Sequence, residues 1–85
     1  MESIKEYLDK LEINNSGLGK QLKEVYINRV VYFKEDKIVY FYLTSKDIVS
    51  HELLDKFKEE LMYKLDYFKD MRMKIRFTGL ERKSN

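Results

Sequence analysis

The sequence predicts one small α+β domain with the element order α-β-β-α-β. Two segments repeat apolar residues at helical spacing, and three segments carry the alternating, β-branched and aromatic residues that are typical of strands. The chain has 85 residues, which is the length of a single domain. We therefore expect a helix at 3–12, a core at 24–78 in which a helix covers one face of a three-stranded sheet, and a tail at 79–85.

The N-terminal segment predicts the first helix. Ser3 and Glu6 have the spacing of a capping box, in which each side chain hydrogen-bonds the backbone N–H of the other residue. Apolar residues follow at helical spacing, namely Ile4, Tyr7, Leu8 and Leu11. Asparagine, serine and glycine then interrupt the pattern. Leu18 and Leu22 beyond them predict either one more helical turn or an ordered loop.

Residues 24–33 and 38–43 predict an antiparallel hairpin around the polar turn 34–37. In the first strand, simple alternation places Val25, Ile27, Val31 and Phe33 on one face, and Tyr26, Asn28, Val30 and Tyr32 on the other. In the second strand, Val39, Phe41 and Leu43 share one face, and Ile38, Tyr40 and Tyr42 share the other.

Arg29 falls in the apolar row of the first strand. Either it lies at the sheet edge with its stem packed and its charged head in water, or a β-bulge shifts the register near Val30 and Val31. Both interpretations remain open from the sequence.

Ser50 predicts the start of the second helix, which ends near Asp66. Its apolar stripe consists of Leu53, Leu54, Phe57, Leu61 and Leu65. The third strand, 71–77, alternates without a break. It places Met71, Met73, Ile75 and Phe77 on one face, and Arg72, Lys74 and Arg76 on the other. Gly79 ends this strand, and Glu81–Asn85 predict a frayed tail.

We expect the third strand to lie beside the first, which gives the spatial order two-one-three. The first strand carries apolar residues on both faces, as a central strand does. Under the sheet, Phe57 and Leu61 should pack against Val39, Phe41 and Ile75.

Composition excludes several classes of protein. Net charge is only +2 although 38% of residues are charged, so any basic surface requires segregation of charge. The absence of cysteine excludes thiol chemistry and cysteine-based zinc sites, and it favours a cytoplasmic location. No apolar run approaches the length of a membrane span, and the N-terminus is unlike a signal peptide.

The sequence predicts no catalytic residue, no metal site and no cofactor. His51 is the single histidine and lies in the first turn of a helix, where a solvated side chain is the ordinary case. The segment Gly17–Gly19 follows no strand and lacks the Lys-Ser/Thr pair or the third glycine of a phosphate loop.

The sheet face opposite the second helix is the candidate site. It is predicted to carry Tyr26, Tyr32, Tyr40, Tyr42, Arg72, Lys74 and Arg76. Such a face suits a protein interface, a plain solvated sheet or single-stranded nucleic acid, which needs aromatic rings for its bases and cations for its phosphates. Alternatively, the first helix covers it through Ile4, Leu8 and Leu11.

Several segments resemble the N-terminal domain of PolC-type DNA polymerase III, the replicative α subunit of low-GC Gram-positive bacteria. They are the leading "IKEYLDKLEI", the strands around "KEDK", the passage "LTSKDIVSHELLDKF" and the final alternating strand. The resemblance spans most of residues 3–78. It implies a truncated type II KH-like fold, similar to the C-terminal domain of the clamp-loader τ subunit. The chain would then be a fragment of a much larger polymerase with 3'-5' exonuclease activity.

The resemblance implies a non-catalytic protein-interaction domain, with τ as the leading candidate partner. The family's catalytic carboxylates lie outside this region, so no residue is assigned to catalysis. The sequence also lacks the Gly-x-x-Gly segment with which KH domains clamp a nucleic-acid backbone, so direct nucleic-acid binding is expected to be weak or absent. The alternatives are a small module that binds single-stranded nucleic acid through the Tyr/Arg face, and a free-standing protein that dimerises through it.

Overall fold

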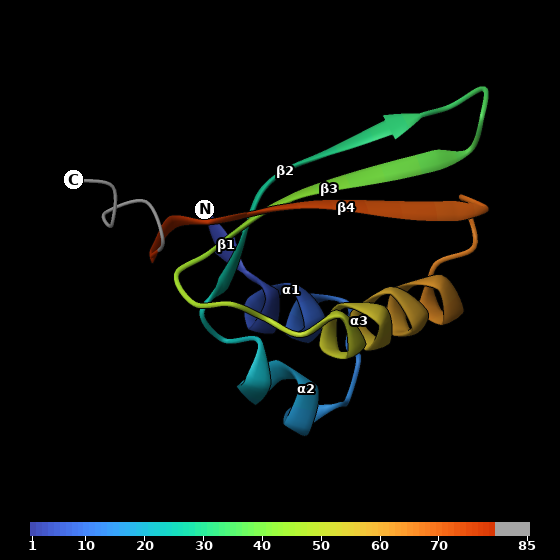
Figure 1. Cartoon of the computed structure of the whole chain (residues 1–85). Helices are drawn as coiled ribbons and strands as arrows, with labels where there is room; N and C mark the ends of the chain where they lie inside the picture. Colours follow the sequence, from blue (N-terminus) through green and yellow to red (C-terminus); the bar gives the residue numbers. More distant parts are fainter. Residues whose placement is uncertain (80–85) are drawn as a thin grey trace.

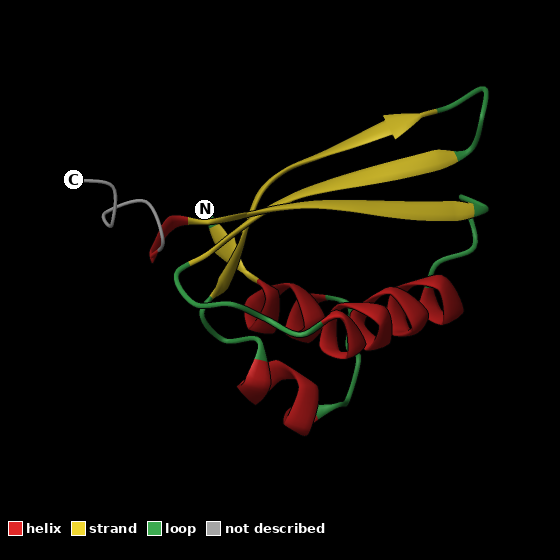
Figure 2. Cartoon of the chain, in the orientation of Figure 1, coloured by secondary structure: helices red, strands yellow, loops and turns green. Residues whose placement is uncertain are grey.

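The computed structural model describes residues 1–79, in which helices lie on one side of a four-stranded sheet (Figures 1 and 2). The elements are β1 (Glu2–Ser3), α1 (Ile4–Lys10), α2 (Ser16–Gln21), β2 (Val25–Phe33), β3 (Ile38–Ser45), α3 (His51–Lys64) and β4 (Asp70–Phe77). The α+β class and each predicted helix and strand are confirmed. The short strand β1 was not predicted. The predicted tail Glu81–Asn85 lies outside the described residues.

The strand order is β1-β2-β3-β4, so the expected order two-one-three is wrong. β4 pairs in parallel with β3, and β3 is the central strand of the predicted three. Beyond β2 lies β1, which pairs with it only at Tyr26 and Ile27. The apolar residues on both faces of β2 pointed to a central strand, but they also occur in this strand, which has only the short β1 on its outer side.

β2 contains a β-bulge. Ile27 pairs with Leu43 and Arg29 pairs with Tyr42, so Asn28 is an extra residue without a paired partner. The bulge interpretation of Arg29 is confirmed, and the shift lies just before Arg29. An extra residue moves every later side chain to the opposite face.

The expected faces of the residues after the bulge are therefore wrong. Val31 and Phe33 lie on the face of Tyr40, whereas Val30 and Tyr32 lie on the face of Phe41 and Val39.

Side-chain caps fix the starts of the helices α1 and α3. In the predicted capping box, the Ser3 hydroxyl accepts from the Glu6 N–H at 3.1 Å, and the Glu6 carboxylate accepts from the Ser3 N–H at 3.0 Å. Ser50 begins α3 by accepting from the Leu53 N–H at 3.3 Å. α1 lies on the same side of the sheet as α3 (Figure 2), so it does not cover the Tyr/Arg face.

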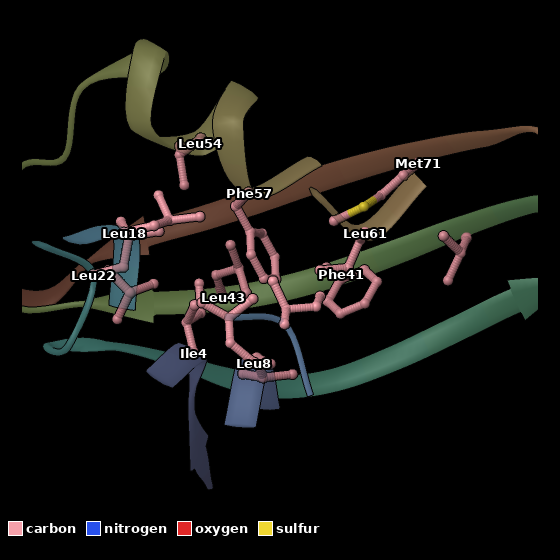
Figure 3. Packing of buried hydrophobic residues seen from close by; sticks show 14 of the residues in the cluster. Ile4, Leu8, Leu18, Leu22, Phe41, Leu43, Leu54, Phe57, Leu61 and Met71 are labelled. Atoms are coloured by element: carbon pink, nitrogen blue, oxygen red, sulfur yellow. The ribbon is translucent and has the colours of Figure 1, made fainter. Parts of the chain in front are cut away.

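The core forms where α1 and α3 meet β3. The Phe57 ring meets Phe41 edge to face at a centroid distance of 5.8 Å, and Tyr7 meets Phe41 at 5.6 Å. Figure 3 shows Phe57 and Leu61 directed toward the strands, with Met71 beside Leu61. The predicted contact of Phe57 with Phe41 is therefore confirmed.

The segment after α1 is the helix α2 rather than an ordered loop. The Asn15 side-chain oxygen accepts from the Leu18 N–H at 3.1 Å, and its amide donates to Glu60 of α3 at 3.0 Å. Leu18 and Leu22 are buried in the shared core. One residue thus starts α2 and links it to α3.

Gly79 closes the end of the sheet. Its N–H donates to the Lys46 carbonyl at 3.1 Å, and a Cβ atom built on Gly79 would collide with that carbonyl oxygen. Glycine permits this close approach of two backbones.

Candidate interaction surface

The sheet face opposite the helices, named the open face here, has no helix over it within residues 1–79 (Figure 2). It comprises Tyr26, Arg29, Val31 and Phe33 of β2, Ile38, Tyr40, Tyr42 and Thr44 of β3, and Asp70, Arg72, Lys74 and Arg76 of β4. The register places these residues in rows across three strands. Of the predicted site residues, the open face brings together all but Tyr32.

An aromatic row runs along the open face. The rings of Tyr40 and Tyr42 lie nearly parallel, with centroids 6.4 Å apart, and Phe33 meets Tyr40 edge to face at 5.4 Å. Because alternate residues of one strand share a face, β3 alone supplies both tyrosines. The rings are half-buried by one another and by neighbouring side chains.

Cations lie over this aromatic row. The Arg29 guanidinium carbon is 4.5 Å from the centroid of Tyr42, and the Lys74 ammonium is 5.9 Å from the centroid of Tyr40. Both distances are within the range of cation–π attraction. Each of the two stacked tyrosines of β3 therefore has one cation over it, Arg29 of β2 over Tyr42 and Lys74 of β4 over Tyr40.

Positive charge prevails on the open face. Its residues include the cations Arg29, Arg72, Lys74 and Arg76, against the carboxylate of Asp70. That carboxylate lies at one end of the face, so the basic character is strongest along the middle of β4.

Asp70 is held by two cations. Arg72 Nε lies 3.2 Å from one carboxylate oxygen, and Lys58 Nζ of α3 lies 3.4 Å from the other. The hydrogen bond from Arg72 is the main reason that the pKa of Asp70 is lowered, and that from the Met71 N–H adds to it. In turn, Asp70 raises the pKa of Arg72, which stays charged at any physiological pH.

Tyr32 does not belong to the open face, contrary to the expectation from simple alternation. It pairs with Val39 on the helix side, where its hydroxyl donates to the Tyr67 carbonyl at 2.8 Å. The two rings also meet edge to face at 5.2 Å. The bulge at Asn28 is the physical reason for this exchange of faces.

Sequence reasoning missed Arg29 and Phe33 as members of the open face. The available signal was the charge of Arg29 in an otherwise apolar row, because such a row tolerates a cation only at an edge or after a bulge. Asn28 marks the bulge itself, and its side chain donates to Thr44 at 2.6 Å.

His51 is exposed at the start of α3, and no group of three or more potential metal ligands is found in residues 1–79. A hollow of about 290 Å³ lies at one end of the open face beside Tyr26, Thr44 and Gly79. In the part of the chain that the structure describes, no helix is both long and apolar enough to cross a membrane.

Together, the fold and the open face define a small α+β domain that presents an aromatic and basic sheet surface. The sequence profile of the family described as DNA polymerase III polC-type N-terminus I matches residues 3–75 of the 85-residue chain. The chain belongs to this family, and it is thus an N-terminal domain of PolC-type DNA polymerase III. Comparison with curated proteins and with solved structures gave no match.

Proposed function

We propose that this domain is a non-catalytic protein-interaction domain of the bacterial replisome and that its open face contacts another replisome protein. The leading candidate partner is the C-terminal domain of the clamp-loader τ subunit. The domain would act in the cytoplasm as part of a replicative polymerase and would leave nucleotide chemistry to other modules of that enzyme.

The observation that carries this proposal is the row of aromatic rings that no described helix covers and over which two cations lie. Tyrosine and arginine are the residues on which binding energy concentrates in protein interfaces. Arg29 over Tyr42 and Lys74 over Tyr40 are already ordered in the free chain, so less conformational entropy is lost on binding. The family match supports the replication context but names no partner.

The direct test titrates the 85-residue chain with the purified τ C-terminal domain at physiological salt. Tyr42→Ala should lower the affinity by at least tenfold, or about 1.4 kcal/mol, since an aromatic residue at the centre of an interface typically contributes about 2 kcal/mol or more. Tyr63→Ala is the matched control, because Tyr63 is 92% exposed on α3 and away from the open face. An equal loss in both variants, or no τ binding by the native chain, would contradict the proposal.

A second candidate is single-stranded nucleic acid. Arg72, Lys74 and Arg76 recur at every second residue of β4, roughly 7 Å apart and close to phosphate spacing. However, Arg29 lies over the Tyr42 ring at 4.5 Å, so a base must displace it to stack there.

Oligonucleotide affinity measured over a range of salt separates the two candidates. Each phosphate neutralised on a single strand lowers log K by about 0.7 per tenfold increase in salt. We expect weak oligonucleotide binding that vanishes near physiological salt. Tight, salt-tolerant binding without τ binding would instead favour the nucleic-acid function.

A further inference from the structure

β4 forms an outer edge of the sheet. On one side it pairs with β3, and within residues 1–79 no strand pairs with its other side. The Asp70 N–H points inward, to the Lys37 carbonyl at 3.4 Å, whereas the Met71 N–H is turned away and bonds the Asp70 carboxylate at 2.8 Å. Since the direction alternates along a strand, Met73 and Ile75 present their N–H and carbonyl groups at the outer edge.

A groove follows this edge. It lies between β4 and α3, has a volume of about 350 Å³, and is lined by Leu54 of α3 and by Met73 and Ile75 of β4. Leu54 is buried, and the two strand residues are half-buried beside the core. The exposed residues His51 and Asp55 border the groove on the helix side. An apolar side chain can pack against Leu54, Met73 and Ile75, and the charged residues Lys58, Asp70 and Arg72 line the rest of the groove.

The other free edge is less suited to pairing. β2 is covered by β1 at Tyr26 and Ile27, and the bulge at Asn28 follows directly, which leaves only the five residues 29–33 in regular register beyond it. Bulges are a common means of protecting a sheet edge from further pairing. β4 has eight residues in unbroken register with β3.

We propose that the outer edge of β4 accepts an extended segment of a partner protein, in which acidic and apolar residues alternate, as a fifth strand. Its apolar residues enter the groove beside Met73 and Ile75. Its acidic residues lie on the open-face side, across from Arg72 and Lys74, where oppositely charged cross-strand pairs are favourable. This adds a second contact surface to the proposed function, and it does not depend on τ as the partner.

A second copy of this chain fits the edge poorly. Antiparallel pairing of two β4 strands that keeps the apolar rows on one face places Arg72, Lys74 and Arg76 opposite the same residues of the other copy. Like charges directly opposite one another destabilise a sheet. The charge of β4 therefore selects an acidic segment over self-association.

The test uses a fluorescein-labelled nine-residue peptide, EVEVEVEVE, kept at nanomolar concentration and titrated with the 85-residue chain. We expect saturable binding, and at least tenfold weaker binding of KVKVKVKVK. Two further peptides carry N-methyl groups on either the glutamate or the valine nitrogens. Because only one set of peptide N–H groups can face β4, one of these peptides should lose binding and the other should retain it.

Variants of the chain locate the site. Met73→Pro removes an outward N–H without removing a hydrogen bond to β3, so it should abolish binding, whereas Met73→Val keeps the donor and should retain it. Should Met73→Pro fail to fold, the protection of the Met73 and Ile75 amides from hydrogen exchange in the native chain gives the same information. Both amides should exchange at least tenfold more slowly with peptide bound.

Three outcomes would overturn the proposal: no binding of EVEVEVEVE, equal binding of both N-methylated peptides, or unchanged exchange at Met73 and Ile75 with peptide bound. None of these variants alters the tyrosines of the open face. A τ titration that fails while the peptide binds would therefore reject the proposed function and leave the edge site standing.

Discussion

The two faces of this sheet are built from alternate residues of the same strands, yet they are held in different ways. On the helix side, Val39, Phe41 and Leu43 are almost completely buried under α1 and α3. On the open face, Tyr40 and Tyr42 are half-buried and are covered only by neighbouring side chains. The comparison teaches that burial under helices fixes one face, whereas contacts between side chains of adjacent strands order the other.

The largest expected effect contrasts one aromatic residue from each side of the sheet. Phe57→Ala removes the ring that meets Phe41 in the core and should lower the free energy of unfolding by about 3–5 kcal/mol. Tyr42→Ala should cost about 1 kcal/mol, since it loses only half-exposed ring contacts. Urea unfolding of both variants measures the difference. A loss below about 1 kcal/mol for Phe57→Ala would show that α3 presents a different side to the sheet.

A pair of single-residue deletions tests the bulge that separates the two faces. Deleting Asn28 joins the pairs Ile27–Leu43 and Arg29–Tyr42 into one regular ladder, so every remaining side chain keeps its face. The cost should be about 1 kcal/mol, from the lost hydrogen bond to Thr44. Deleting Val30, which lies in the regular part of the ladder, moves the side chains on one side of the deletion to the opposite face of the sheet. Apolar core residues of β2 or its polar residues would then face the wrong side, so this deletion should prevent folding. Circular dichroism and thermal melting measure the folding and stability of the two deletion variants. An equal loss of stability in both would contradict the observed register.

The core face could be predicted from the sequence, because buried positions require apolar residues and the spacing of those residues along the chain shows which side of each element is buried. The stripe with Phe57 and Leu61 on α3, and the alternation of Val39 and Phe41 in β3, each define one buried side. The cation–π contacts could not be predicted, since Arg29 reaches Tyr42 only through the cross-strand register after the bulge.

The strand order was mispredicted because apolar residues on both faces of β2 do not prove a central position. In the observed register, Ile27 and Val30 lie on the helix side and Val31 and Phe33 lie on the open face, yet β2 has β3 on one side and only the short strand β1 on the other.

A smaller effect is expected from the guanidinium over the aromatic row. Arg29→Gln should lower the free energy of unfolding by about 0.5–1 kcal/mol, because an exposed cation–π contact is lost. Arg29→Lys keeps the charge but not the planar group that stacks on the ring, so its effect should be intermediate. The proton chemical shifts of the Tyr42 ring report the contact directly. If these shifts are the same in all three chains, the guanidinium does not lie over Tyr42 in solution.

The smallest expected effect is the pH dependence of the stability that Asp70 contributes. The hydrogen bond from Arg72 and the Met71 N–H lower the pKa of Asp70 in the folded chain, and the charge of Lys58 adds to this. A carboxyl group whose pKa falls on folding stabilises the fold above its unfolded pKa, about 3.9, and this stabilisation disappears as the pH falls through the folded pKa. Asp70→Asn should therefore be slightly less stable than the native chain at pH values above about 4, and the difference should close on further acidification. Because the ion pairs are partly exposed, about 1 M NaCl should shrink the difference at every pH. Thermal melting from neutral to acidic pH at low and high salt measures it, and a difference that widens as the pH falls below about 4 would mean that the native contacts favour the protonated form of Asp70.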